Sequence, residues 1–365
     1  MAQSILKPIP VKSTAEIEQP RLNFGLHPVM LLMLIGVLVF LFLLSLALGS
    51  VDIPLRDIVH VLMGGEASKT AWTNIIIKVR LPEATTAMLA GAALAISGLQ
   101  MQTFFRNPLA GPFVLGISSG ASLGVALVVL SAGTISGAFL ISINRVSDWN
   151  IAIAASLGAG LVMMLVLLIA RKVENTMTLL ILGLMIGYLT TSLVSLLLYF
   201  SIAEQIQAYI NWTFGSFGGV TWSQMKVFAP ITLFGLATAL ILSKTLNALL
   251  LGEDYARSLG LNIMRARIAI VFSTAILAGT VTAFCGPIAF IGVAVPHLCR
   301  ALFRTSDHRV LVPGTILMGA IMALTASLIA ELPGSSITLP LNAVTSFIGA
   351  PVVIWFILRR QRITL

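Results

Sequence analysis

Long apolar runs, separated by short polar stretches, fill most of this 365-residue chain. A helix needs roughly 20 mainly apolar residues to cross the hydrocarbon core of a bilayer. The runs that approach or reach this length are Val29–Leu48, Ala84–Phe105, Val114–Ala132, Ile151–Ala170, Leu179–Phe200, Val227–Leu242, Ile268–Phe284, Ile288–Phe303, Val310–Ala330 and Leu341–Leu358. This pattern predicts an all-α integral membrane protein with about ten transmembrane helices.

The polar stretches define the organisation of the chain. Residues 1–28 are expected to form a poorly ordered arm, because they contain both charge signs and no apolar periodicity. Residues 29–358 form one ten-span domain, and residues 359–365 form a short tail. The first outer loop, 50–78, carries acidic and basic side chains, and a short helix is expected in it near Leu55–Met63.

The distribution of Lys and Arg predicts how these spans are oriented in the membrane. Sixteen of the 22 Lys and Arg fall on the side that holds both termini, and six fall on the other. The six are Arg56, Lys69, Lys78, Arg80, Arg145 and Lys226. Basic residues concentrate in the cytoplasmic loops of inner-membrane proteins. We therefore expect a multi-pass protein of the bacterial inner membrane with both termini in the cytoplasm.

Composition excludes several other classes. The chain is 58% hydrophobic and 10% charged, whereas a soluble domain has about 25% charged residues. Topology accounts for the net charge of +9, so we expect membrane lipid around the chain and no nucleic-acid partner. The two cysteines, Cys285 and Cys299, lie in apolar segments and are expected to be buried, inert thiols.

The absence of some motifs narrows the mechanism. No ionisable Lys, Arg, Asp or Glu falls in the middle of a predicted span, which weakens an ion-coupled carrier, although backbone carbonyls could still hold sodium. The phosphate-binding motif of P-loop ATPases does not occur in the sequence. The four histidines form no ligand cluster. We therefore expect no catalytic residue, no metal site and no directly bound cofactor, and any ATP must be hydrolysed by another subunit.

Small residues recur inside the second and third runs, at Gly91–Gly98 and Gly116–Gly124. Lipid provides little drive for helices to associate, so close packing of small residues often does so. We expect these segments to pack against neighbouring helices, although some of their hydroxyl groups could instead line a pathway.

The cytoplasmic loop 244–267 has an unusual composition. Gly252 and Gly260 bracket a stretch of helix size, and Glu253 and Asp254 stand in its first turn, where the helix dipole favours acids. Leucines and an alanine give the same stretch apolar faces. These faces either pack against the protein's own spans or dock into a groove on a partner.

At this point the sequence resembles a known family, the FecCD-type permease subunits of ABC importers for iron chelates, haem and cobalamin. The resemblance runs from about Leu46 to Arg360. The motifs that carry it are Arg80-Leu-Pro82, Gly91–Gly98, Gln102, Asn107–Pro112, Leu115–Ala121, Gly252–Asn262, Gly286–His297, Asp307–Arg309, Val344-Thr345 and Gly349-Ala-Pro351. Each motif is short, but their number and their common order make the match specific.

The resemblance implies a homodimer or a paired permease, with ten spans in each copy and a central pathway, and we expect the second copy to be this same chain. It implies two ATP-binding cassette ATPase subunits beneath and a periplasmic or lipoprotein substrate-binding protein above. The loop that would couple to the ATPase consists of Leu251, Gly252, Glu253, Asp254, Tyr255, Ala256, Arg257, Ser258, Leu259 and Gly260. Asn107 and Leu109 match a region that helps to seal the cytoplasmic gate, and Asn175 and Thr176 hold a similar place, although polar loop residues also serve as simple caps.

The sequence departs from the family pattern on the outer side. Relatives often carry a second arginine where this chain has Glu83, three residues after Arg80, and a basic residue where it has Glu331. In the family such arginines meet carboxylates of the binding protein, which these acids would repel. We therefore expect Arg80, Glu83 and Glu331 to face a partner that carries basic residues, unless the alignment slips locally or the acids pair internally.

The transported substrate is less defined by the sequence. No residues are available to coordinate a metal, which fits a cargo that is already chelated. Ser192, Ser195, Tyr199 and Ser201 give a polar and aromatic strip that could line the pathway or face neighbouring helices. We expect a ferric siderophore, as the commonest cargo of the family, with cobalamin and haem as alternatives. Two alternatives from other functional classes remain: a secondary carrier that works without ATP, and a receptor that transports nothing.

Overall fold

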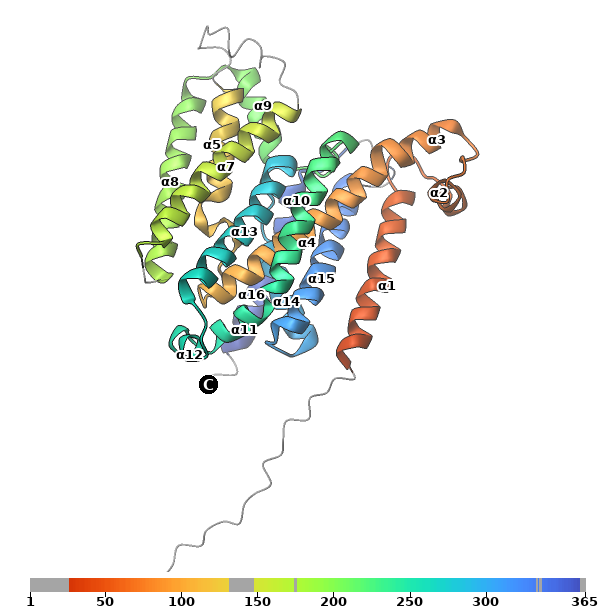
Figure 1. Ribbon diagram of the computed structural model, residues 1–365. Coiled ribbons are helices and arrows are strands. Elements are labelled where there is room, and N and C mark those ends of the chain that lie inside the picture. The colour runs from red at the N-terminus through yellow and green to blue at the C-terminus, as the bar shows by residue number, and fades with distance from the viewer. Residues whose placement is uncertain (1–25, 131–147, 174–175, 333, 335–336, 362–365) are drawn as a thin grey trace, which may run out of the picture.

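The computed structural model describes residues 26–130, 148–173, 176–332, 334 and 337–361. Every regular element in these ranges is helical, which confirms the all-α prediction (Figure 1). The predicted N-terminal arm, 1–28, lies almost wholly outside the described residues, as does the end of the predicted tail.

Each predicted span corresponds to a helix. The helices are α1 (Leu26–Ala47), α4 (Leu81–Phe104), α5 (Ile117–Val129), α7 (Asp148–Ala170), α8 (Thr176–Tyr199), α10 (Trp222–Ile241), α13 (Ile263–Cys285), α14 (Ile291–Phe303), α15 (His308–Glu331) and α16 (Leu341–Gln361). Within the described ranges, eight of them are long and apolar enough to cross a membrane. The other two, α5 and α14, have 13 residues each, or about 20 Å of helix, so the count of ten spans stays a prediction.

Shorter helices occupy the polar loops. They are α2 (Leu55–Leu62), α3 (Thr70–Ile75), a π-helical turn (Ile76–Arg80), a 3-10 turn (Pro112–Leu115), α9 (Ala203–Thr213), α11 (Ser243–Leu250) and α12 (Glu253–Ser258). The helix expected in the first outer loop is present as α2. The predicted third span begins three residues late, because Gly116 adopts a left-handed conformation (φ 73°) between the 3-10 turn and α5.

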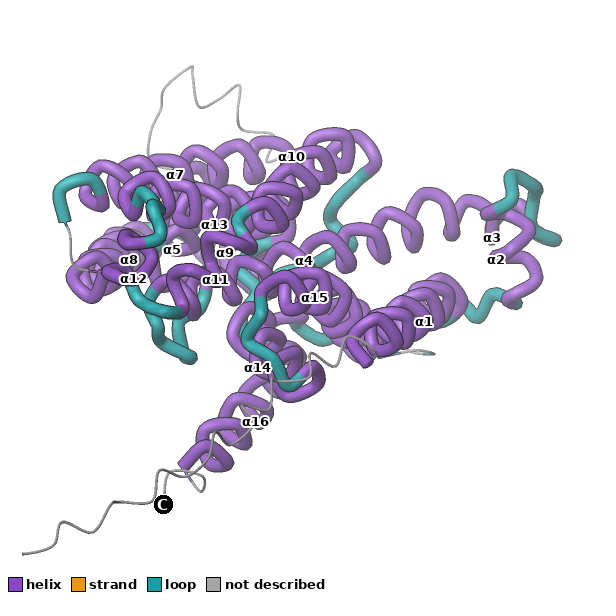
Figure 2. Tube along the Cα trace, turned by 60° about the horizontal axis from the view of Figure 1, so that its bottom comes forward, coloured by secondary structure: helices purple, strands orange, loops and turns teal. Residues whose placement is uncertain are grey.

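The helix α4 runs through the centre of the protein. It contacts α10, α13, α14 and α15, and these helices surround it in both views (Figures 1 and 2). A side chain at Gly91 would overlap the backbone of Gly319, and one at Gly98 would overlap the backbone of Gly292. The small residues predicted to pack closely therefore bring α4 against α15 and α14.

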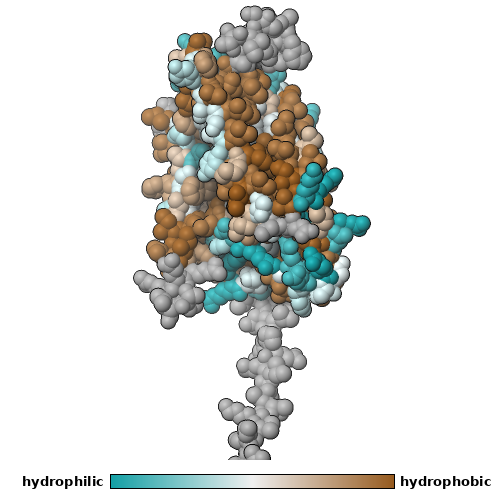
Figure 3. All heavy atoms as spheres, turned by 90° about the vertical axis from the view of Figure 1, so that its left-hand side faces the viewer, coloured by the Kyte–Doolittle hydropathy of each residue, from teal (hydrophilic) through white to brown (hydrophobic). Residues whose placement is uncertain are grey.

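Two apolar clusters build the interior. One gathers side chains of α1, α4, α10, α14 and α15, and the other gathers side chains of α5, α7 and α8, with α13 contributing to both. The outer surfaces are also apolar. On the side that carries α8, hydrophobic atoms cover much of the face and hydrophilic atoms gather toward the lower end (Figure 3). A surface of this kind suits contact with lipid.

Candidate functional site

The loop 244–267, predicted to be cytoplasmic, contains a short helix between two glycines, as its sequence predicts. Gly252 precedes α12 with a φ of 117°, and Glu253 and Asp254 stand in the first turn. At the other end, Gly260 has a φ of 86°. Its N–H donates to the carbonyl of Arg257 at 3.0 Å, and the next N–H, of Leu261, donates to the carbonyl of Ala256 at 3.0 Å. This pair of bonds is a Schellman cap, for which glycine is the favoured residue.

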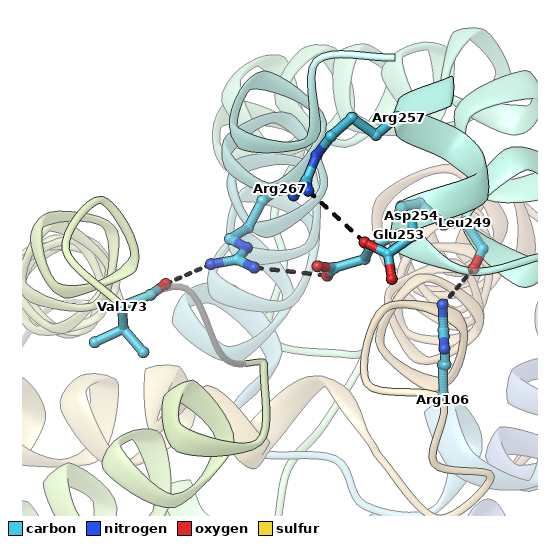
Figure 4. Close-up of polar contacts among 7 residues, drawn as sticks. All are labelled: Arg106, Val173, Leu249, Glu253, Asp254, Arg257 and Arg267. Atoms are coloured by element: carbon cyan, nitrogen blue, oxygen red, sulfur yellow. Dashed lines mark hydrogen bonds and ion pairs between the residues drawn. The ribbon is translucent and has the colours of Figure 1, made fainter. Parts of the chain in front are cut away.

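A buried arginine fixes α12 to the rest of the protein (Figure 4). Arg267 lies near the start of α13, and only 3% of its side chain is exposed. It pairs with Glu253 of α12 at 3.5 Å and donates a hydrogen bond to the carbonyl of Val173, just after α7. One side chain thus ties three segments together. The pair of Asp254 and Arg257 at 3.7 Å is exposed and adds little stability.

A second arginine supports α11. Arg106 follows the end of α4 in a left-handed conformation (φ 48°) and donates to the carbonyl of Leu249 at 3.4 Å, near the end of α11 (Figure 4). A positive side chain at a helix C-terminus interacts favourably with the helix dipole. Arg106 therefore links the end of the central helix to the segment that precedes α12.

The helix α11 is also fastened to α15. The Asn247 side chain donates to the carboxylate of Asp307 at 2.6 Å and accepts the backbone N–H of His308 at 2.8 Å. Asp307 itself caps α15 by accepting the N–H of Arg309 at 2.9 Å. Partial burial by itself would raise the pKa of Asp307, but the hydrogen bonds from Arg309 and Asn247 hold that pKa below its usual range.

Part of the loop's apolar surface is left uncovered. Leu249 and Ala256 are buried against the protein, which bears out self-packing for these two residues. In contrast, Leu251, Tyr255 and Leu259 are 65%, 52% and 62% exposed. Tyr255 and Leu259, four residues apart, share one face of α12 and its C-cap, and Leu251 lies just before the break at Gly252. We call these three exposed residues the α12 stripe.

A cleft of about 500 Å³ adjoins the α12 stripe at the cytoplasmic end. Its walls are formed by Phe104, Phe105, Arg106, Thr176, Leu249, Leu251, Gly252, Glu253, Asp254 and Tyr255. The first half of the predicted coupling loop, 251–255, therefore meets the end of α4 and the start of α8 around one opening.

The predicted gate residues lie near this end. The side chain of Asn107 accepts the N–H of Leu109 at 2.9 Å, so Asn107 forms a local turn, while Leu109 is exposed. The intervening Pro108 bonds through its carbonyl to the ring of His297 at 2.8 Å, which fastens the turn to α14. Thr176 begins α8 and borders the cleft. Asn175 lies outside the described residues.

The predicted pathway residues lie along α8 and just after it. The hydroxyls of Ser192 and Ser195 donate to carbonyls of their own helix, at 2.9 and 3.0 Å, and both residues are exposed. Tyr199 is also exposed. Ser201 differs, because its hydroxyl donates to the carbonyls of Leu197 at 2.6 Å and Leu130 at 3.3 Å. The strip therefore reaches the surface of this chain except at Ser201.

The outer end contains a second buried arginine. Arg80 is 7% exposed, and its guanidinium donates to three backbone carbonyls, of Leu46 at 2.7 Å, of Ala47 at 2.9 Å and of Val51. These carbonyls lie at the end of α1 and just beyond it. The side chain predicted to meet a partner thus faces the chain itself, and contact with a partner would require it to leave these carbonyls.

The two acids predicted on the outer face lie together. Glu83, in the first turn of α4, lies within hydrogen-bonding reach of Glu331 at the end of α15 and of the Ser327 hydroxyl. Both carboxyl groups border an outer cleft of about 330 Å³, whose other walls come from the segment after α9 and from residues 338–341. Glu83 and Glu331 therefore interact with each other and also reach an open cleft.

Some residues of these sites were missed by sequence reasoning. Arg267 and Arg106 were counted only as cytoplasmic charges, yet they hold α12 and α11 in place. His297 is buried against Phe356, with a distance of 4.1 Å between the ring centroids. The sequence does contain a signal for the role of Arg267. This residue directly precedes a long apolar run, where an unpaired charge would be costly, so a partner for it could have been predicted.

Among the residues that the structure describes, no group of three or more His, Cys, Asp or Glu side chains is arranged to hold a metal ion. Cys285 and Cys299 are both buried and free.

Comparison with known proteins identifies the class. Residues 37–359 match the FecCD transport family. The vitamin B12 import system permease protein BtuC of Klebsiella pneumoniae is 37% identical over 348 residues, which cover 95% of this chain and 97% of BtuC. The protein of the same name from Salmonella typhi is 38% identical over 289 residues, which cover 78% of this chain and 84% of that protein.

A solved structure agrees with these relatives. A metal-chelate type ABC transporter in an inward-facing conformation superposes with a TM-score of 0.79 and 29% sequence identity, covering 91% of this chain and 99% of the other. Permease subunits of such transporters span the membrane several times and leave ATP hydrolysis to separate subunits. The chain therefore belongs to the FecCD transport family and is the permease subunit of an ABC importer.

Proposed function

We propose that this permease carries vitamin B12, a cobalamin, across the bacterial inner membrane. The observation that carries the proposal is the similarity over nearly the full chain to permeases whose names specify vitamin B12 import. The relatives thus favour cobalamin over the ferric siderophore expected from the sequence. Cobalamin arrives with its metal already chelated, which suits a chain in which the described residues offer no metal-binding cluster.

A ferric chelate is the second candidate. It is favoured by the structural similarity to a transporter of the metal-chelate type, at 29% identity. A siderophore and cobalamin are both large, so either needs a pathway defined by shape and polarity. Haem is the third candidate substrate.

We assign the ATPase contact to the α12 stripe. The support comes from its position, because Leu251, Tyr255 and Leu259 are exposed in the loop predicted to be cytoplasmic, beside the charged Asp254 and Arg257. Burial of one such side chain stabilises by roughly 1.5–3 kcal/mol, which corresponds to about ten- to a hundredfold in affinity. Arg267 and Arg106 would hold the stripe in a fixed position, so that movement of the ATPase is transmitted to α13 and α4.

We assign the pathway to a pair of permeases, with a second copy of this chain as the partner. The support is the exposed polar and aromatic strip on α8, formed by Ser192, Ser195 and Tyr199, whose side chains suit the wall of a polar passage. The turn at Asn107 and Leu109, together with Thr176 and Asn175, would close this passage toward the cytoplasm.

We assign the binding-protein contact to the outer cleft at Glu83 and Glu331. Two adjacent acids at the mouth of a cleft complement a partner with basic side chains. Arg80 would contribute by fixing the end of α1 against the start of α4, through its three backbone carbonyls.

Transport in vesicles tests the proposal. The chain would be reconstituted with its own ATPase and binding protein, and uptake of labelled cyanocobalamin and of a labelled ferric siderophore would be compared. ATP-dependent accumulation of cobalamin alone would support the proposal, and accumulation of the iron chelate alone would overturn it. Uptake driven by an ion gradient without ATP would indicate a secondary carrier.

A further inference from the structure

The short outer helix α2 exposes an unusually apolar face. Its side chains Leu55, Val59 and Leu62, with the adjacent Met63, are all exposed, and Met63 reaches 76%. On a helical wheel these four residues form one continuous sector. Another sector of the helix, with Ile58 and Val61, is buried. The helix thus has more apolar surface than the protein itself covers.

The polar side of α2 is occupied by the loop that follows it. The ring of His60 bonds to the carbonyl of Glu66 at 2.7 Å. The carboxylate of Asp57 accepts both the N–H and the hydroxyl of Ser68, at 2.7 and 2.6 Å. The side chains of Asp57 and His60 are therefore satisfied within the chain, whereas the exposed Arg56 lies at the edge of the open apolar face, beside Met63.

The position of α2 indicates what covers this face. The helix lies level with the outer end of α1 and projects sideways beyond it, away from the bundle (Figures 1 and 2). The 22 residues of α1 extend about 33 Å, close to the roughly 30 Å of the hydrocarbon core. The outer end of α1 therefore lies near the head groups, and exposed side chains of α1 such as Val39 and Phe40 continue the apolar surface toward α2.

Two tryptophans mark the same level. Lys69 stands over the ring of Trp72 at 4.6 Å. Trp222 begins α10 and donates from its ring N–H to the carbonyl of Ile77 at 2.7 Å, in the π-helical turn. Tryptophan is enriched at membrane–water interfaces, where its ring is apolar and its N–H is polar.

We propose that α2 is an interfacial anchor whose apolar face lies among the acyl chains of the outer leaflet, just beneath the head groups. The occupant of the face is phospholipid. The polar side of the helix and its loop then face water. Such an anchor holds the end of α1 and the segment 48–54 at a fixed depth beside the start of α4; Arg80 is bonded to Leu46 and Ala47 in α1 and to Val51 in the segment. This proposal requires only a membrane-spanning chain and does not depend on the transported substrate.

Spin labels test the depth of α2. The native Cys285 and Cys299 are buried, so a nitroxide reagent reaches an introduced cysteine selectively. Labels would be placed at Met63→Cys and, as controls, at Thr70→Cys on the exposed polar start of α3 and at Phe40→Cys on α1. The full-length chain would be reconstituted in vesicles of phosphatidylethanolamine and phosphatidylglycerol. Collision of each label with oxygen and with a water-soluble nickel chelate would then be measured.

The ratio of collision with oxygen to collision with the nickel chelate is expected to be several-fold higher for the label at position 63 than for the label at 70. It should come close to the ratio for the label at 40. Equal ratios at 63 and 70 would overturn the proposal. So would protection of the label at 63 that appears only when the binding protein is added, since the partner would then be that protein. Val59→Cys provides a second position on the same face in case the first variant folds poorly.

Discussion

The two ends of this permease use buried arginines in the same way but present opposite surfaces to their partners. At the cytoplasmic end, Arg267 joins α12 to α13 and to the end of α7, and the surface it supports is the apolar α12 stripe. At the outer end, Arg80 joins α1 to α4, and the surface beside it contains the acids Glu83 and Glu331. In both places a buried arginine fixes the geometry, and under our proposal recognition is then apolar at the α12 stripe and electrostatic at Glu83 and Glu331.

Replacement of the two arginines should have the largest effects. In Arg267→Met, Glu253 loses its buried partner, so we expect a loss of about 3 kcal/mol in stability together with loss of ATPase binding. In Arg80→Met, three backbone carbonyls lose their donor, so we expect a similar loss of stability with weakened binding of the outer partner. Thermal unfolding in detergent and copurification of each partner would measure both effects.

Arg265→Met is the matched control, because Arg265 is exposed and lies two residues from Arg267 on the same helix. It should leave stability and ATPase binding unchanged. If each variant, Arg267→Met and Arg80→Met, lost the ATPase and the binding protein equally at unchanged stability, the two arginines would not support separate binding surfaces.

Changes in the α12 stripe should have the next largest effect. The double variant Tyr255→Ser and Leu259→Ser removes two exposed apolar side chains, so we expect at least about a hundredfold weaker ATPase binding with an unchanged melting temperature. Arg265→Gln changes an exposed side chain outside the predicted coupling residues and serves as the control. Full ATPase affinity in the double variant would show that the stripe does not form the contact.

Charge reversal on the outer face should have a smaller, salt-dependent effect. The double variant Glu83→Lys and Glu331→Lys is expected to lower the affinity of the binding protein for the permease by about tenfold at low salt. The loss of affinity should shrink as ionic strength rises, because salt screens exposed charges. Titration by surface plasmon resonance at several salt concentrations would measure this. Stronger binding in the double variant would mean that the partner presents acids, as in the relatives.

The smallest effect is expected at Asp307. Asp307→Ala removes the cap of α15, which should cost about 1 kcal/mol. The folded protein holds the pKa of Asp307 below its ordinary value, so the carboxylate stabilises the fold above the ordinary Asp range. This stabilisation is lost as the pH falls through the folded-state pKa. The difference in melting temperature between Asp307→Ala and the parent chain should therefore narrow on acidification, and a constant difference would contradict it.

The sequence predicted the helices well because lipid imposes a simple rule of length and apolarity. Each apolar run corresponds to a helix, and Gly252 and Gly260 correctly bracketed α12. The prediction missed α9, whose mixed polar and apolar residues resemble a loop. It also placed the start of α5 too early, since the left-handed turn at Gly116 could not be distinguished from a packing glycine.

The contacts of the sites could not be predicted from spacing. Arg267 pairs with Glu253 across a turn and with Val173 from a distant helix, and a backbone carbonyl carries no mark in the sequence. Arg80 was expected on a docking surface because its charge is visible in the sequence, whereas its carbonyl partners are not. The resemblance to the family supplied the class and the loop, and the structure supplied the frame that holds the loop.

The central claim is that the α12 stripe contacts the ATPase subunit, and site-specific photo-crosslinking tests it most directly. A photoreactive phenylalanine would replace Tyr255 in one sample and Phe234, an exposed side chain of α10, in another. Both chains would be assembled with the ATPase in lipid vesicles and irradiated. The account predicts a crosslink to the ATPase from position 255 and none from position 234. A crosslink from position 255 only to the permease itself, in a complex that hydrolyses ATP, would contradict it.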